Sequence, residues 1–132
     1  MKITADTNLL ARAIMGDDEQ QSAIARRELA QAELVALALP ALCELVWILL
    51  RGYKIPAAQV ATAIRKLIDS ENVEVNRLAV EAGLEQLEAG GDFADGVIVF
   101  EGLMAGADTF VSFDKKAVEL TQKFGFAAEI PV

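Results

Sequence analysis

Short apolar runs alternate with longer amphipathic stretches along this chain, a pattern that is typical of strands separated by helices. The predicted strands cover residues 3–5, 35–39, 73–75, 109–111 and 127–130, and the predicted helices cover 8–15, 18–31, 41–50, 56–68, 77–87, 92–104 and 115–123. Strands that alternate with helices favour a parallel sheet covered on both faces. The pattern therefore predicts an α/β fold, in the form of a three-layer α/β/α domain around a central parallel sheet.

Local residue chemistry adds two finer expectations for the first helices. Thr7 or Asn8 has the short polar side chain that caps the start of a helix, so either is expected to begin the first one. The second helix is predicted to carry four residues along one face, Ala23, Ile24, Arg27 and Ala30.

Composition bounds both the architecture and the chemistry. The chain has 132 residues, of which 54% are hydrophobic, and it shows no linker or repeat, so a single domain is predicted over 1–132. It contains no histidine, which excludes Ser-His-Asp and Cys-His catalysis and histidine-ligated zinc. The one cysteine, Cys43, cannot form an internal disulfide and is predicted to pack as a small hydrophobe.

One apolar stretch, residues 34–50, has nearly the length of a membrane-spanning helix. It carries a charge at Glu44, which would be costly inside a bilayer, and Pro40 divides it as a strand followed by a helix would require. We therefore expect this stretch to be buried in a folded domain and not in a membrane. The absence of an export signal and the sparse use of cysteine favour a cytoplasmic location.

The formal net charge of −8 counts against nucleic acid as a partner, unless metal ions neutralise some of the acids. Local basic groups persist within this acidic chain. The pairs that could contact a phosphate backbone are Arg26 with Arg27, Arg51 with Lys54, and Lys115 with Lys116, although each is also compatible with an ordinary solvated surface.

Four acids, each in or beside an apolar stretch, carry the candidate chemistry: Asp6, Glu44, Asp95 and Asp114. Asp6 and Asp114 come just after predicted strands, and ligands of parallel sheets bind beyond the carboxyl ends of the strands. Ionised carboxylates near a core are costly unless something compensates the charge. Mg²⁺ and Mn²⁺ prefer oxygen ligands, so a shared hard cation would compensate it.

Each acid also has a purely structural interpretation. Asp6, Asp92 and Asp114 could cap helices, and Glu44 could interact with the positive end of a helix, although this would not explain the burial expected from its apolar neighbours. Asp92 and Asp95, three residues apart, would share a helix face. Taken together, the acids at these element ends are harder to explain as caps alone.

Four motifs together resemble the PIN-domain ribonucleases. They are Asp6-Thr7-Asn8 after the first strand, Glu44 early in the third helix, Asp92-Phe93-Ala94-Asp95 before an apolar helix, and Ser112-Phe113-Asp114-Lys115 after a strand. The resemblance extends from Lys2 to Pro131, and the short single-domain form is most similar to the VapC-type toxins of toxin–antitoxin pairs.

This resemblance implies a metal-dependent endoribonuclease that acts as the toxin of a toxin–antitoxin system. It implies Asp6, Glu44, Asp95 and Asp114 as catalytic acids, Asp6 and Asp95 as direct ligands of Mg²⁺ (with Mn²⁺ as an alternative), and Glu44, Asp114 and Asp92 as further potential ligands. Asn8 and Ser112 match supporting polar positions, and Arg51, Lys54, Lys115 and Lys116 are candidate RNA contacts. RNA as substrate, a cognate antitoxin and a homodimer are the implied partners.

The chain departs from the family pattern in the helix that follows Asp95. Gly96 stands where a small Ala is usual, and it is expected to loosen the helix by roughly 1 kcal/mol relative to Ala. Phe100 and Glu101 replace small residues, which affects the expected packing or a subunit contact at this place. None of these departures touches the acids.

Two other functions remain open at this stage. A phospho-accepting receiver domain is also an α/β fold with an acidic Mg²⁺ site, but it needs paired acids after the first strand and an Asp after the third. Here the first strand offers Asp6 alone, and the third is followed by Asn76. The second alternative is a catalytically silent PIN-like module that acts only by binding.

Overall fold

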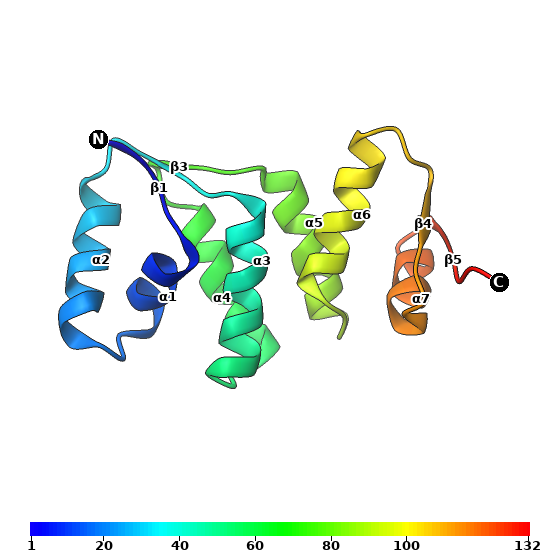
Figure 1. Cartoon of the computed structure of the whole chain (residues 1–132), viewed down its shortest axis with the longest axis horizontal. Helices are drawn as coiled ribbons and strands as arrows, with labels where there is room; N and C mark the ends of the chain where they lie inside the picture. Colours follow the sequence, from blue (N-terminus) through cyan, green and yellow to red (C-terminus); the bar gives the residue numbers. More distant parts are fainter. The chain divides into compact units, whose positions relative to one another are not determined.

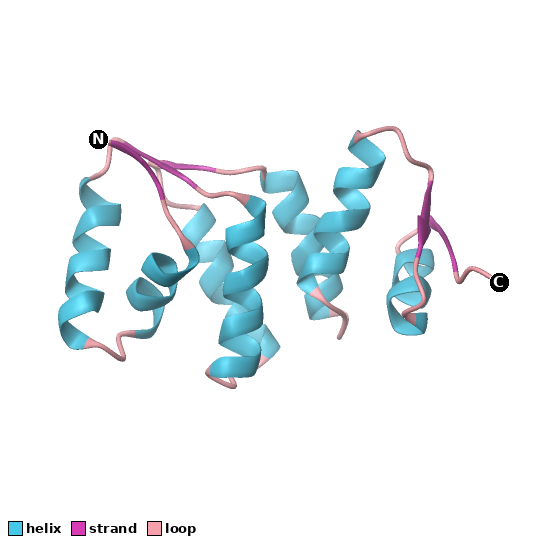
Figure 2. Ribbon diagram, viewed as in Figure 1, coloured by secondary structure: helices cyan, strands magenta, loops and turns pink.

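Helices alternate with short parallel strands in the computed structural model, which describes all residues from 1 to 132 (Figures 1 and 2). The chain forms two compact units, Met1–Val75 and Asn76–Val132, which we call unit 1 and unit 2. Each unit contains its own parallel strands and its own helices.

Unit 1 contains three strands and the helices that connect them. Its elements are β1 (Lys2–Thr4), α1 (Thr7–Met15), α2 (Glu19–Gln31), β2 (Leu34–Ala36), α3 (Leu39–Trp47), the π-helix η1 (Ile48–Gly52), α4 (Ala57–Ile68) and β3 (Val73–Glu74). The strands pair in parallel in the order β1-β2-β3, with Ile3 opposite Val35 and Val35 opposite Val73. Parallel neighbours need long crossover connections, which the helices provide.

The apolar stretch at residues 34–50 supplies much of the core of unit 1. Its helix α3 begins at Leu39, earlier than predicted, with Pro40 in the first turn, where the missing N–H of proline removes no helix hydrogen bond. The same helix continues into η1, and Cys43 is half-buried within it. The largest fully buried side chains of unit 1 are Leu10, Val35, Leu42, Leu45, Val46, Leu49, Val60, Ile64 and Ile68.

Helix α2 packs through small side chains. Ser22 and Ala25 are its buried residues, whereas Ile24 is 41% exposed. The four residues predicted to share one face (Ala23, Ile24, Arg27 and Ala30) are all exposed. Small residues let α1 and α2 lie close together, and Arg26 Nε ties the two helices by donating to the Ala13 carbonyl at 2.8 Å.

Unit 2 is built around a tightly packed pair of helices. Its elements are α5 (Arg77–Glu88), α6 (Phe93–Met104), β4 (Thr109–Val111), α7 (Lys115–Lys123) and β5 (Ala127–Glu129). The strands β4 and β5 pair in parallel, with Phe110 opposite Ala128, and α7 connects them. Helices α5 and α6 share the most extensive helix–helix contact of the unit.

Two glycines permit this close contact of α5 with α6. A Cβ built on Gly96 would overlap the carbonyl oxygen of Ala82 and would lie 2.8 Å from the Cα of Gly83. A Cβ on Gly83 would lie 2.7 Å from the ring of Phe93. Gly96 therefore has a packing role that the sequence did not show, because it lets two helix backbones meet beside Asp95. The expectation that this glycine only loosens α6 was incomplete.

These observations confirm the mixed α/β class with parallel strands. The strands form a three-stranded sheet in unit 1 and a two-stranded sheet in unit 2, so a single three-layer domain remains a prediction. None of the helices is both long and apolar enough to cross a membrane.

The contact between α5 and α6 predicts the effect of adding one methyl group. Gly96→Ala should lower the free energy of unfolding by about 1–3 kcal/mol, because overpacking against a backbone outweighs the better helix propensity of alanine. Gly102→Ala is the matched control in the same helix, since its Cβ would meet only the Ala107 Cβ at 3.9 Å. It should be neutral or stabilising by up to about 1 kcal/mol. Urea unfolding checks both, and a Gly96→Ala chain as stable as the control would contradict the tight contact.

Candidate functional site

Asp6 lies directly after β1, at the point where α1 begins. Its Oδ1 accepts a hydrogen bond from the backbone N–H of Leu9 at 2.9 Å, so Asp6 itself is the N-cap of α1. The prediction that Thr7 or Asn8 would cap this helix was wrong, because the helix already includes Thr7. The cap holds an exposed carboxylate at the carboxyl end of a parallel strand, as the sequence predicted.

Glu44 is linked to the start of α1 by a side-chain hydrogen bond. The Oγ1 of Thr7 donates to Glu44 Oε2 at 3.0 Å and lies 3.4 Å from the Ala41 carbonyl oxygen. Glu44 is exposed, while its neighbour Leu45 is fully buried. The expected burial of Glu44 was therefore wrong: this residue is on the solvent side of an otherwise apolar helix.

A pocket of about 230 Å³ in unit 1 opens beside this first group of residues. Asp6 and Asn8 both line it, so the predicted supporting residue and the predicted ligand share one solvent-accessible hollow. Its other lining residues are Leu9, Arg12, Gln21, Ile24 and Ala25.

The acids of unit 2 lie at the starts of two helices. Asp92 caps α6, with Oδ1 accepting from the Ala94 N–H at 2.9 Å, and Asp114 caps α7, with Oδ1 accepting from the Ala117 N–H at 3.1 Å. Asp95 is in the first turn of α6 and is half-buried. The structural interpretation as caps is thus correct for Asp92 and Asp114, but it does not account for Asp95.

Ser112 supports the position of Asp114. Its Oγ accepts a hydrogen bond from the backbone N–H of Asp114 at 3.0 Å, which fixes the turn between β4 and α7. The predicted supporting role of Ser112 has this geometric basis within unit 2.

Asp95 is held in an environment that disfavours its ionised form. Burial raises the pKa of Asp95 above the ordinary value of 3.8, and the negative charges of Asp92 and Asp114 raise this pKa further. The structure therefore brings these three acids within electrostatic reach of one another. A cation near Asp95 would favour the ionised carboxylate and would therefore lower its pKa.

The structure thus brings the predicted site residues together in two sets, one in each unit. Neither unit holds a group of three or more Asp, Glu or Cys side chains close enough to bind a metal ion by itself. The set of unit 1 consists of Asp6 and Glu44, joined through Thr7, and the set of unit 2 consists of Asp92, Asp95 and Asp114.

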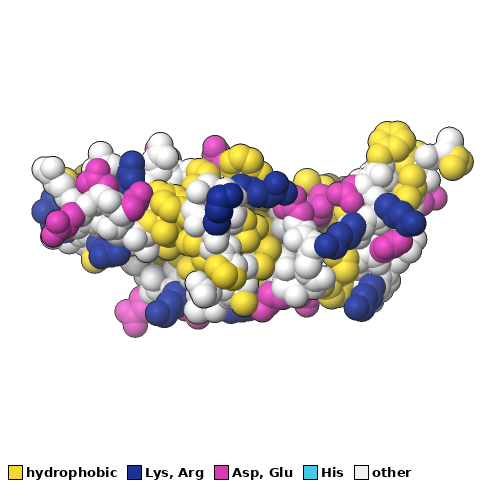
Figure 3. Space-filling model, turned by 90° about the horizontal axis from the view of Figure 1, so that it is seen from below, with side chains coloured by type: hydrophobic (Ala, Val, Ile, Leu, Met, Phe, Trp, Pro, Cys, Tyr) yellow, Lys and Arg dark blue, Asp and Glu magenta, His cyan; other side chains and the backbone are white.

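The candidate RNA contacts are all exposed. Lys115 and Lys116 lie in the first turn of α7, directly after Asp114, whereas Arg51 and Lys54 flank the end of η1. On the face shown in Figure 3, basic and acidic side chains are intermixed and no broad patch of one charge is seen. Contact with a phosphate backbone would therefore depend on individual cations.

A polar cluster fixes the segment that carries Arg51 and Lys54. Tyr53, between them, donates its hydroxyl to Asp17 Oδ2 at 2.8 Å, and Arg12 forms an ion pair with the same oxygen at 3.1 Å. The Tyr53 hydrogen bond is the main cause of the lowered pKa of Asp17. Lys54 has a φ of 56°, which is uncommon for a lysine and marks a sharp turn after η1.

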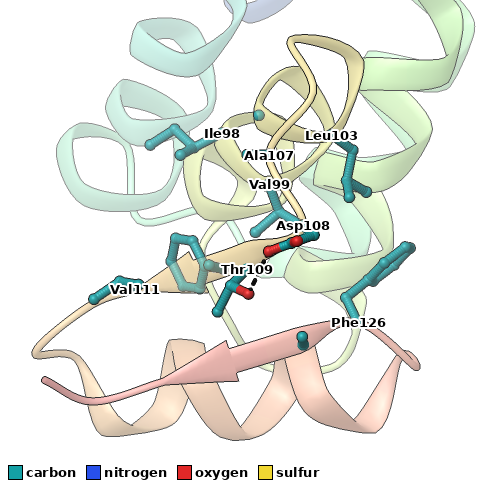
Figure 4. Close-up of a pocket in the computed structure, with 11 residues that line it drawn as sticks. Ile98, Val99, Leu103, Ala107, Asp108, Thr109, Val111 and Phe126 are labelled. Atoms are coloured by element: carbon teal, nitrogen blue, oxygen red, sulfur yellow. Dashed lines mark hydrogen bonds between the residues drawn. The ribbon is translucent and has the colours of Figure 1, made fainter.

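The candidate acids Asp92, Asp95 and Asp114 do not line the two apolar pockets of unit 2. Figure 4 shows a pocket of about 220 Å³ between α6 and the β4–β5 strands, where Val99 and Leu103 face Phe126. At its rim the Thr109 hydroxyl donates to Asp108 Oδ1 at 2.7 Å. Phe100, the bulky departure from the family pattern, lines a second apolar pocket of about 70 Å³. Neither pocket has the chemistry of a phosphodiester site.

No protein-family model matches the chain, and no curated protein matches its sequence. A functional assignment therefore depends on the site residues themselves. The sequence does not show that Thr7 meets Glu44, 37 positions away, because this hydrogen bond depends on the packing of α1 against α3.

The raised pKa of Asp95 predicts a specific dependence of stability on pH. Because the folded protein binds the Asp95 proton more tightly than the unfolded chain does, this residue lowers the stability of the wild type as pH rises through its folded pKa. Asp95→Asn stays neutral, so its free energy of unfolding relative to the wild type should rise as the pH is raised above the ordinary Asp pKa of 3.8.

Urea unfolding in EDTA at several pH values measures this difference. Asp108→Asn is the control, since Asp108 is an exposed acid of the same unit that accepts the hydroxyl of Thr109. A difference for Asp95→Asn that stays constant with pH, or one that matches the control, would show that Asp95 titrates normally.

Proposed function

We propose that this chain is a metal-dependent endoribonuclease of the PIN type, acting as the toxin of a toxin–antitoxin pair. One observation supports the proposal above the others. The half-buried Asp95 has two further acids within electrostatic reach, and the charges that act on its pKa are all negative. Ionised carboxylates gathered in this way are stabilised by a divalent cation. The resemblance in motif order then favours phosphodiester cleavage as the reaction.

In this proposal Asp6 and Asp95 are direct ligands of Mg²⁺ or Mn²⁺, and Glu44, Asp114 and Asp92 are further potential ligands. Such an ion, when bound, would acidify a water molecule and stabilise negative charge on a phosphoryl group. The caps at Asp6 and Asp114 hold each carboxylate by one oxygen, which orients it without neutralising it. Asn8 lines the hollow beside Asp6, and Ser112 fixes the turn that carries Asp114.

The proposed substrate is RNA, which carries one negative charge per phosphate. A chain with a net charge of −8 needs local cations to hold it. Lys115 and Lys116 directly follow the capping acid Asp114 and could contact phosphates next to the scissile one. Arg51 and Lys54 are the corresponding candidates in unit 1, where Tyr53 anchors their segment.

A receiver domain fits the structure less well. The position after β3, where a phospho-accepting Asp would be required, is occupied by Val75 and Asn76, and Asn76 caps α5 by accepting from the Ala79 N–H at 3.2 Å. A catalytically silent PIN-like module would keep the acids without cleaving RNA, and the assay below separates it from a nuclease.

The proposal makes Asp6 and Asp95 metal ligands, so loss of either carboxylate should impair cleavage. Asp6→Asn and Asp95→Asn should each reduce RNA cleavage by more than about 100-fold, beyond the loss typical of outer-shell residues. Each variant should still fold, because asparagine can replace Asp6 as the cap of α1 and is neutral at the half-buried position of Asp95. Cleavage of total RNA is measured with Mg²⁺, with Mn²⁺ and with EDTA, and Asp108→Asn serves as the active control.

Calorimetric titration with Mn²⁺ measures what Asp6 and Asp95 each contribute to ion binding. Either single variant should bind Mn²⁺ more weakly than the wild type. Undiminished cleavage in EDTA would exclude the metal mechanism. Full Mn²⁺ affinity in one of the two variants would exclude the substituted residue as a ligand.

A toxin of this kind requires a cognate antitoxin, and a homodimer is also part of the proposal. A basic segment of that antitoxin, carrying arginine, could bind the carboxylates in bidentate fashion and block access to RNA. Expression of the chain alone should arrest growth, co-expression with the product of the neighbouring gene should restore growth, and Asp6→Asn alone should be harmless. Normal growth at levels where RNA cleavage is measurable would exclude the toxin role but not the nuclease.

A further inference from the structure

We infer that Thr7 is a positioning residue that acts through Glu44, an inference that rests on the proposed nuclease function. The Thr7 hydroxyl donates to Glu44 Oε2 at 3.0 Å, and this bond joins α1 to α3 across 37 positions of the chain. Thr7 directly follows Asp6. The bond therefore ties the carboxylate of Glu44 to the start of the same helix that Asp6 caps.

The geometry of the hydroxyl favours Glu44 as its acceptor. A threonine hydroxyl has one proton, and its two neighbouring acceptors are Glu44 Oε2 at 3.0 Å and the Ala41 carbonyl at 3.4 Å. The shorter bond leads to a carboxylate, and hydrogen bonds to charged acceptors are the stronger ones. Donation to Glu44 is therefore the preferred state.

The two partners differ in mobility, and this difference gives Thr7 its role. Thr7 is 9% exposed and β-branched, so few rotamers are open to it and its hydroxyl is confined to a small region beside Glu44. Glu44 is exposed on α3, and its longer side chain would otherwise sample many rotamers in solvent. A rigid buried donor that holds a mobile exposed carboxylate fixes where that carboxylate points.

Valine has the shape of threonine without the hydroxyl, so Thr7→Val removes the bond and little else. In the full chain with Mg²⁺ it should lower kcat for RNA cleavage by about 10- to 100-fold, the range typical of groups that orient metal-site ligands, with little change in KM. Thr7→Ser should restore most of the activity. Thr62→Val is the matched control, because the exposed Thr62 hydroxyl bonds only within its own helix, to the Ala58 carbonyl at 3.0 Å.

A double-mutant cycle with Glu44→Gln decides whether Thr7 acts through Glu44. If it does, Thr7→Val should reduce kcat in the wild-type background and should have almost no further effect in the Glu44→Gln background. Mn²⁺ affinity, measured by calorimetry, should follow the same non-additive pattern. Thermal unfolding without metal reports whether each variant is folded, and Thr7→Ala, which adds no bulk, replaces Thr7→Val if valine prevents folding.

The outcomes separate this inference from the proposed function. Wild-type kcat in folded Thr7→Val, or an equal loss in both backgrounds, would overturn the positioning role while the nuclease proposal stood. Full activity in Glu44→Gln would overturn it as well, since Thr7 would then have no functional partner. A wild-type chain that cleaves no RNA with Mg²⁺ would instead overturn the proposed function and this inference together.

Discussion

The hydrogen bond from a backbone N–H at the start of a helix to an aspartate carboxylate fixes the positions of four of the 20 acids of this chain. Asp6, Asp18, Asp92 and Asp114 each accept such a bond, at distances of 2.9, 3.0, 2.9 and 3.1 Å. The bond satisfies an otherwise unpaired donor and sets a negative charge at the positive end of the helix. Three of these acids belong to the candidate site, so their structural and functional interpretations are compatible.

A comparison of Asp18 with Asp95 separates an acid that only caps a helix from a candidate site residue. Asp18 caps α2 by accepting a hydrogen bond from the Gln21 N–H at 3.0 Å, and it is not one of the candidate site residues. Asp95 makes no cap bond, is half-buried, and feels the charges of two capping neighbours. Burial, and after it the charges of the two caps, raise the pKa of Asp95.

The sequence predicted the elements well where local chemistry decides them. The bounds of β4 and α7 agree with the prediction, because the apolar run marks the strand and Asp114 marks the start of the helix. The outward direction of Ile24 could not be predicted, since close packing between α1 and α2 selects small residues over apolar ones. Glu44 was expected to be buried because its neighbours are apolar, yet a helix with an apolar majority still has a solvent side.

The candidate site was predictable to a similar degree. The sequence placed Asp6 and Asp114 beyond the ends of parallel strands, and the structure has both acids there, while their role as metal ligands stays a prediction. It could not show that Thr7 meets Glu44, because this contact depends on the packing of α1 against α3. The sequence also could not show that the backbone of α5 lies where a Cβ of residue 96 would be, since glycine in a helix usually indicates only flexibility.

The contact of Gly96 with the backbone of α5 has a consequence for the motions of Asp95. Side chains at an interface can change rotamer independently, but two backbones in direct contact can separate only as whole helices. Helices α5 and α6 should therefore open as one cooperative unit, with their amide hydrogens exchanging together. Asp95, one residue before this contact, would then keep its place until the helix pair opens as a whole.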